Sequence, residues 1–194
     1  MNVFFNGVKS KIKKAIKTGF TLTKSEIGDE KVYAVAFVTD SDYVTLWLGI
    51  NTYEHLEKKD AEYAKNGDDS TTKWDPSDWG YSVGDEQFDS ISEKLSDKMD
   101  KVIDSIEKKN SDLSFEQLEE IIKDSDFAKE FIEMLTSVLH ELIQSNSFGF
   151  DNDEVTYFIS ISDDERAVEI ENNSAKVLNS KELYQEFVKR ETSY

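Results

Sequence analysis

Two long apolar runs constrain the fold of this chain more than any other feature. Residues 31–40 (KVYAVAFVTD) and 43–50 (YVTLWLGI) are rich in β-branched and aromatic side chains, which is typical of strands that are covered on both faces. Only Ser41 and Asp42 separate the two runs, and this is the length of a tight hairpin turn. The sequence therefore predicts a buried antiparallel hairpin.

A change of hydrophobic period near Asn146 marks a second region of strands. Apolar and polar residues alternate over 154–162, which predicts a strand, and again over 168–171, which predicts a fourth strand after a turn at Asp163-Asp164. These two strands would form a second hairpin that ends at Asn172-Asn173. We therefore expect residues 1–194 to form a single α+β domain, with about four mainly antiparallel strands in two hairpins and helices packed against the sheet.

Helical spacing of apolar residues accounts for much of the remaining chain. Asn51 and Glu54 resemble a capping box, and Asn179 or Ser180 is expected to cap the last helix. Asp75 before Pro76 predicts one short helical turn. The helices expected from spacing cover about residues 53–65, 86–109, 115–122, 127–143 and 183–188.

The N-terminal segment carries a charge opposite to that of the rest of the chain. Residues 1–25 contain six lysines and no acid, and Val8, Ile12 and Ile16 recur at helical spacing. We expect residues 1–20 to form a basic amphipathic helix that ends near Gly19 and docks on the acidic domain. A membrane-surface or targeting helix is the alternative interpretation.

Charge and composition restrict the classes of partner. The chain has 41 acidic and 23 basic residues and a net charge of -18, so neither nucleic acid nor an anionic membrane is an expected partner, whereas a basic protein is. Cysteine is absent from the sequence, which excludes disulfides and thiolate metal sites. No apolar run reaches the length of a membrane span, and a cytoplasmic location is the expectation.

The sequence offers little material for catalysis. His55 and His140 are its only histidines, and it contains no Gly-rich phosphate-binding loop and no nucleophile elbow. We therefore predict no catalytic, cofactor-binding or metal-binding residues and no enzymatic activity. Clustered carboxylates leave a metal-dependent hydrolase open as an alternative, although the acids of residues 163–165 are better explained as a solvated turn.

Two acidic regions are candidates for partner binding. Residues 60–89 and 151–171 each carry a net charge of -7, and the first also contains two tryptophans. Aromatic rings among carboxylates could anchor and steer a basic partner; the alternative is a solubilising surface with the rings turned into the core. The predicted partner-binding residues are Asp68, Asp69, Trp74, Asp75, Asp78, Trp79, Tyr81, Asp85 and Glu86.

Four short motifs in this order resemble a bacterial family, number 4303 of the domains of unknown function. They are residues 32–37 with Thr39-Asp40, Asn51-Thr52-x-Glu54, Trp74-x-Pro76-x-x-Trp79-x-Tyr81, and Ser174-Ala175-x-x-Leu178-Asn179. Ser180 stands where the family usually has Pro. The resemblance implies a bacterial origin and a neighbourhood of toxin and immunity genes, and it supplies no catalytic residues.

Charge, composition and resemblance together predict a non-enzymatic acidic binding protein, specifically an immunity protein that neutralises a basic toxin such as a nuclease. The hydrolase described above is one alternative. A regulatory or scaffold protein whose basic N-terminal helix contacts membranes is another.

Overall fold

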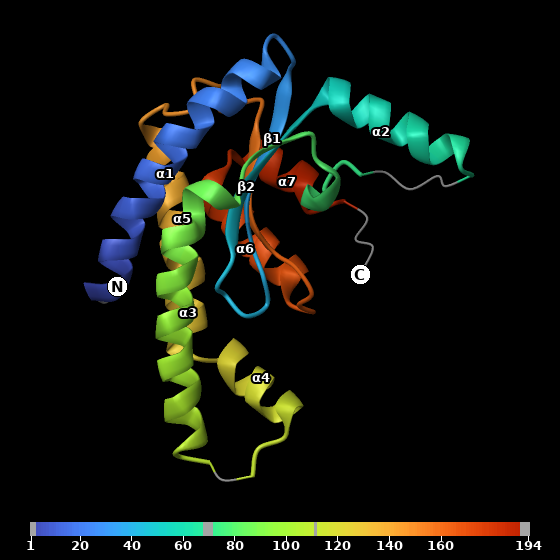
Figure 1. Cartoon of the computed structure of the whole chain (residues 1–194). Helices are drawn as coiled ribbons and strands as arrows, with labels where there is room; N and C mark the ends of the chain where they lie inside the picture. The colour runs from blue at the N-terminus through green and yellow to red at the C-terminus, as the bar shows by residue number, and fades with distance from the viewer. Residues whose placement is uncertain (1–2, 68–71, 111, 191–194) are drawn as a thin grey trace.

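The computed structural model of the protein describes residues 3–67, 72–110 and 112–190. These residues form helices around a small sheet (Figure 1). In chain order the elements are α1 (Val3–Ile27), β1 (Val32–Thr39), β2 (Leu46–Thr52), α2 (Tyr53–Lys65), the 3₁₀ turn η1 (Pro76–Asp78), β3 (Tyr81–Val83), α3 (Asp85–Glu107), α4 (Phe115–Lys123), α5 (Asp126–Gln144), β4 (Thr156–Ile161), α6 (Ala167–Leu178) and α7 (Lys181–Phe187).

The sheet has the strand order β3-β2-β1-β4. Strands β1 and β2 are antiparallel, with Val35 opposite Ile50, which confirms the predicted pairing of the two runs. The predicted two-residue turn is wrong, because residues 40–45 connect the strands and β2 begins only at Leu46. Strand β3 continues the antiparallel pairing at one edge. At the other edge β4 runs parallel to β1, with Val35 opposite Tyr157. The α+β class is confirmed, and the sheet is mixed because of this one parallel pair.

The predicted second hairpin is wrong. The segment expected to be a strand at 168–171 lies in α6, and Asn172-Asn173 is inside that helix rather than at its end. The residues that α6 buries are helically spaced: Ala167, Glu171, Ser174, Ala175 and Leu178. The fourth strand is instead β3, which has three residues and falls in the segment that the sequence left irregular.

The larger of two cores lies on the face of the sheet that α1, α3 and α5 cover (Figure 1). Strand residues such as Phe37, Leu48 and Ile159 meet Phe88 of α3 and Phe131 of α5 there, and all five are fully buried. The helices come from the periodic segments that the sequence identified, and Ser125 caps α5 at the expected break. Helical periodicity therefore predicted the main core well.

A smaller core lies on the opposite face, where α7 and η1 cover strands with short side chains. Ala36 of β1 and Phe158 of β4 pack there against Phe187 of α7. Trp47 and Trp79 approach Gly49 so closely that a Cβ on this glycine would lie 2.8 Å from the Trp47 ring and 3.1 Å from the Trp79 ring. The small residues of the hairpin therefore leave space for large aromatic rings on this face.

Helix α6 protects the exposed edge of β4. Ser174 accepts a hydrogen bond from the backbone N–H of Ile159 (2.9 Å). Asn179 accepts from the N–H of Tyr157 (2.7 Å) and donates to its carbonyl (2.7 Å). Strand edges with unpaired backbone groups promote aggregation. Here the side chains of the following helix form hydrogen bonds with those backbone groups of β4. The Ser-Ala-x-x-Leu-Asn motif is thus part of the architecture of the sheet.

Helix α1 extends beyond its predicted end. Gly19 does not terminate it, because Phe20, Thr23 and Ile27 continue the buried stripe through to the last residue of the helix. Gly19 instead lies where α1 passes β3 and α3, and a Cβ there would be 2.5 Å from Val83 and 2.9 Å from Gln87. The described residues contain no helix long and apolar enough to cross a membrane.

We expect Gly19→Ala to lower the free energy of unfolding by about 1–2 kcal/mol, because crowding costs more than the better helix propensity of alanine gains. Gly7→Ala is the matched control, since Gly7 is on the same helix with nothing within 4 Å of its would-be Cβ. Urea denaturation should show the control unchanged or stabilised by up to about 1 kcal/mol. Equal effects of the two changes would refute the close-approach role of Gly19.

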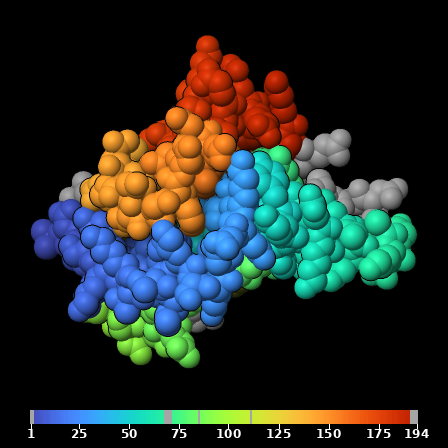
Figure 2. All heavy atoms as spheres, turned by 90° about the horizontal axis from the view of Figure 1, so that it is seen from above, coloured from blue at the N-terminus to red at the C-terminus, as the bar shows by residue number. Residues whose placement is uncertain are grey.

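Helix α2 stands out from one side of the molecule (Figure 2) and buries none of its residues. Thr52, rather than Asn51, is its N-cap and accepts from the N–H of His55 (3.1 Å). Glu54 does not complete a capping box but accepts from the backbone N–H of Lys31 (2.9 Å). Asn51 is buried and donates to the Tyr33 hydroxyl (2.9 Å).

Candidate functional site

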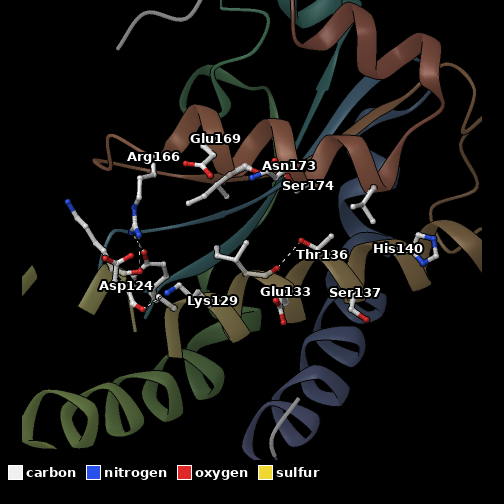
Figure 3. A pocket seen from close by; sticks show the side chains of 16 residues that line it. Asp124, Lys129, Glu133, Thr136, Ser137, His140, Arg166, Glu169, Asn173 and Ser174 are labelled. Atoms are coloured by element: carbon white, nitrogen blue, oxygen red, sulfur yellow. Dashed lines mark hydrogen bonds between the residues drawn. The ribbon is translucent and has the colours of Figure 1, made fainter. Parts of the chain in front are cut away.

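A groove with a volume of about 720 Å³ runs between α5 and α6 (Figure 3). Residues at four-residue spacing along α5 form one wall, and residues 166–177 form the other. Tyr43, from the turn between β1 and β2, closes one end together with Arg166. Grooves of this size can accommodate a small ligand or the side chains of a bound segment.

The floor of this groove is mainly apolar. Ile132 and Ile170 line it, and the side chain of Val177 is 60% exposed. Two of the hydroxyls already have partners inside the domain: Thr136 donates to the carbonyl of Ile132 (2.8 Å), and Ser174 donates to that of Ile170 (2.8 Å) and accepts from the N–H of Ile159. Because the helices satisfy these hydroxyls, the floor presents mostly hydrocarbon to a ligand.

Arg166 connects three segments at the closed end of the groove. Its guanidinium donates to Asp164 (2.9 Å), to the Tyr43 hydroxyl (2.5 Å) and to the carbonyl of Lys123 (2.8 Å). Burial opposes ionisation of Asp164, but hydrogen bonds from Arg166 outweigh this and lower the pKa of Asp164. Burial raises the pKa of Tyr43. This arginine therefore has a structural role and is not free to bind an anion.

Two lysines also line this end of the groove, of which Lys123 is ion-paired and Lys129 is exposed. Lys129 donates to the backbone carbonyl of Asp124 (2.7 Å), and Lys123 lies 3.5 Å from Glu120. In contrast, Glu133 and Glu169 are exposed on the rim and form no ion pair within the part of the chain that the structure describes. Among the exposed lining residues, one cation, Lys129, stands against three acids, Asp124, Glu133 and Glu169, so the net charge of the rim is negative.

The outer face of α3 carries a line of carboxylates. Seven acids recur at intervals of three, four, four, three, four and three residues, which places them on one face of the helix, and all are exposed. We call this set the α3 acidic stripe; it consists of Glu86, Asp89, Glu93, Asp97, Asp100, Asp104 and Glu107. Within the described residues, Asp104 is the member that forms an ion pair, 3.5 Å from Lys108.

Two of the three lysines of α3, Lys94 and Lys98, lie on the side of the helix nearer α1. Lys98 lies over the ring of Phe4 (5.9 Å). Contact with the Lys94 ammonium lowers the pKa of Lys11 in α1, as expected for crowded like charges. These two lysines therefore point away from the α3 acidic stripe and leave most of its carboxylates without an ion pair among the described residues.

The structure does not bring the sequence-predicted partner-binding residues onto one surface. Asp68 and Asp69 lie outside the described residues, and so does the side chain of Asp85. Glu86 is exposed at the start of the α3 acidic stripe, next to the main core. The tryptophans and η1 adjoin the smaller core on the opposite face of the sheet. These residues therefore belong to two separate surfaces.

Asp75, Asp78 and Tyr81 each have local partners. Asp75 caps η1 by accepting from the N–H of Ser77 (3.0 Å), as the sequence predicted. Asp78 accepts from the Tyr63 hydroxyl (2.9 Å). Burial and hydrogen bonding with Glu30 raise the pKa of Tyr81 to about 12. Asp75 thus stabilises η1 locally, whereas Asp78 links η1 to α2.

Trp74 and Trp79 are half-buried and pack in the smaller core. The Trp74 ring meets Phe187 edge-on at a centroid distance of 5.0 Å, and the Trp79 ring meets Phe158 at 5.7 Å. The indole N–H of Trp79 is buried without an acceptor among the described residues. The rings thus have a packing role, which was the alternative interpretation of the sequence.

The two histidines lie apart. His55 of α2 lies 3.1 Å from the carbonyl oxygen of Asp78, and His140 is exposed at the far end of the groove. Among the described residues, no three His, Asp or Glu side chains are grouped closely enough to hold a metal ion.

The groove and the α3 acidic stripe were both missed by sequence reasoning. The stripe had a detectable signal, since its acids follow the same three-four spacing that revealed the apolar face of the helix. The groove had none, because its two walls are separated in sequence and one of them was predicted to be a strand.

Comparison with known proteins gives one match, to the family model described as "Domain of unknown function (DUF4303)", over residues 12–180. No curated protein and no solved structure matches the chain.

Proposed function

The chain belongs to the DUF4303 family, a domain of unknown function, and we propose that it is a non-enzymatic immunity protein that captures and occludes a basic protein toxin, such as a nuclease. The observation that carries this proposal is the α3 acidic stripe. It extends over about 30 Å of helix, a length comparable to one side of a protein interface.

Electrostatics suit such a surface to rapid capture. Carboxylates on one face with few compensating cations attract a Lys- and Arg-rich partner before contact and can raise association rates by about 10- to 1,000-fold. The partner would be neutralised by occlusion, because a basic surface covered by this protein is no longer available to its own anionic substrate. This mechanism requires no bond-making by the chain.

Affinity capture with matched charge variants tests the proposal. In the stripe variant Asp89, Glu93, Asp97 and Asp100 become Lys; in the control variant the exposed Glu57, Glu62, Asp153 and Glu182 become Lys. Each set changes the net charge from -18 to -10, since every reversal adds two. We expect a basic protein from a lysate of cells that carry the gene to be retained by the wild type and the control variant and lost by the stripe variant.

Two outcomes would contradict this. One is retention of the same basic protein by the stripe variant. The other is equal loss from both variants, which would indicate a dependence on net charge rather than on α3. Melting curves of the variants establish that each remains folded.

A further inference from the structure

The groove between α5 and α6 has the shape of a seat for a third helix. Ala128, Ile132, Thr136 and His140 follow one another along α5 at four-residue spacing, so this wall is about 18 Å long. A helix of about 12 residues, or three turns, spans that distance. Binding of an amphipathic helix in a groove between helices is a recurring mode of protein recognition.

We propose that this groove is the docking site for one amphipathic helix of the partner protein. The apolar face of that helix would cover Ile132, Ile170 and Val177, and its flanking Lys or Arg side chains would pair with Glu133 and Glu169. The inference rests on the proposed function in one respect, namely that the occupant is a segment of a captured protein.

The apolar part of the argument comes from the floor. Val177 is aliphatic, 60% exposed and two turns from Ile170 along α6. The hydroxyls of Thr136 and Ser174 already have hydrogen-bond partners inside the domain. Apart from the exposed side chain of Asn173, the groove floor offers an occupant few polar partners, so an occupant gains most from hydrocarbon that removes the floor from water.

The sign of the occupant's charge follows from the rim. Arg166 is paired with Asp164 and Lys123 with Glu120, which leaves the one exposed cation of the lining, Lys129, among three exposed acids. Two of these acids, Glu133 and Glu169, lie on opposite walls. A basic helix can pair with both carboxylates, whereas an acidic helix would place like charges beside them. The groove therefore selects against acidic helices as well as for basic ones.

A pair of isomeric peptides tests this. The amphipathic probe is a 14-residue fluorescein-labelled peptide with Leu at positions i, i+3, i+4 and i+7 and Lys elsewhere; the scrambled probe has the same composition without that spacing. We expect the wild-type protein to bind the amphipathic probe at least about 10-fold more tightly than the scrambled probe by fluorescence anisotropy.

Substitutions in the groove should remove this preference. Val177→Arg and Glu169→Lys both change exposed side chains, so the fold should persist, which melting curves can check. For Val177→Arg we expect the ratio of the two dissociation constants to fall to about one. For Glu169→Lys both constants should rise, with the larger rise for the amphipathic probe.

The stripe variant separates this inference from the proposed function. The stripe variant should bind both probes more weakly to a similar extent, so the ratio of the two dissociation constants should stay unchanged. The reason is that the α3 acidic stripe attracts the charge of a peptide whatever the spacing of its leucines. A wild-type ratio near one, or a ratio that survives Val177→Arg, would overturn the docking site while capture through α3 could still stand. A ratio of dissociation constants above 10 without capture of any basic protein would refute the proposed function but would still support the groove as a docking site for a helix.

Discussion

Replacing Arg190 by alanine should lower the free energy of unfolding by about 3–5 kcal/mol, the cost of leaving a buried carboxylate without its partner. The guanidinium of Arg190 lies 2.7 Å from Glu171, and the exposed fractions of these two side chains are 3% and 1%. Ser160 of β4 donates to the other oxygen of Glu171 (2.7 Å). The pair therefore attaches the C-terminal segment to both α6 and the sheet.

The double variant Arg190→Met with Glu171→Leu distinguishes lost charge pairing from lost packing. If the unpaired carboxylate causes the loss, the double variant should be clearly more stable than Arg190→Ala. Lys189→Ala, at an exposed neighbouring position, should change stability by less than about 0.5 kcal/mol. Urea denaturation measures all three; a loss below 1 kcal/mol in Arg190→Ala would show that the ion pair contributes little.

The sequence correctly predicted those helices and strands whose buried residues recur at one regular spacing. The central hairpin comes from two apolar runs that lie close together in the sequence, and α3 and α5 have long three-four spacings. Tertiary context therefore changed little in these elements beyond the length of the hairpin loop.

Non-local contacts decided the rest. Residues 168–171 fit a strand as well as a helix over so short a window, and the choice depends on α6 covering the edge of β4. The parallel pairing of β1 with β4 brings together segments separated by most of the chain. Strand β3 is too short to show any period.

The motif residues that carry the family resemblance proved to be structural. Asn179 forms a hydrogen bond with the backbone at the edge of β4, and Trp74 and Trp79 pack against the smaller core. Since such residues reveal how the chain folds rather than what it binds, the candidate surfaces had to come from geometry. The groove needs α5 and α6 side by side, while the α3 acidic stripe needed only the helical period applied to acids.

Reversing four charges of the α3 acidic stripe should slow association with the captured basic protein at least about 10-fold at low salt. The reason is the range of the electrostatic attraction. At 0.01 M salt the screening length is about 30 Å, so the carboxylates along the stripe act together on an approaching partner. At 0.15 M salt, where this length is about 8 Å, the difference should shrink. Stopped-flow mixing with the stripe and control variants measures both rates.

Growth rescue tests the central claim most directly. Cells that express the captured basic protein should stop growing, should recover when the wild type or the control variant is co-expressed, and should not recover with the stripe variant at an equal protein level. Rescue by the stripe variant as complete as that by the wild type, or no rescue by the wild type, would contradict neutralisation through the acidic face of α3.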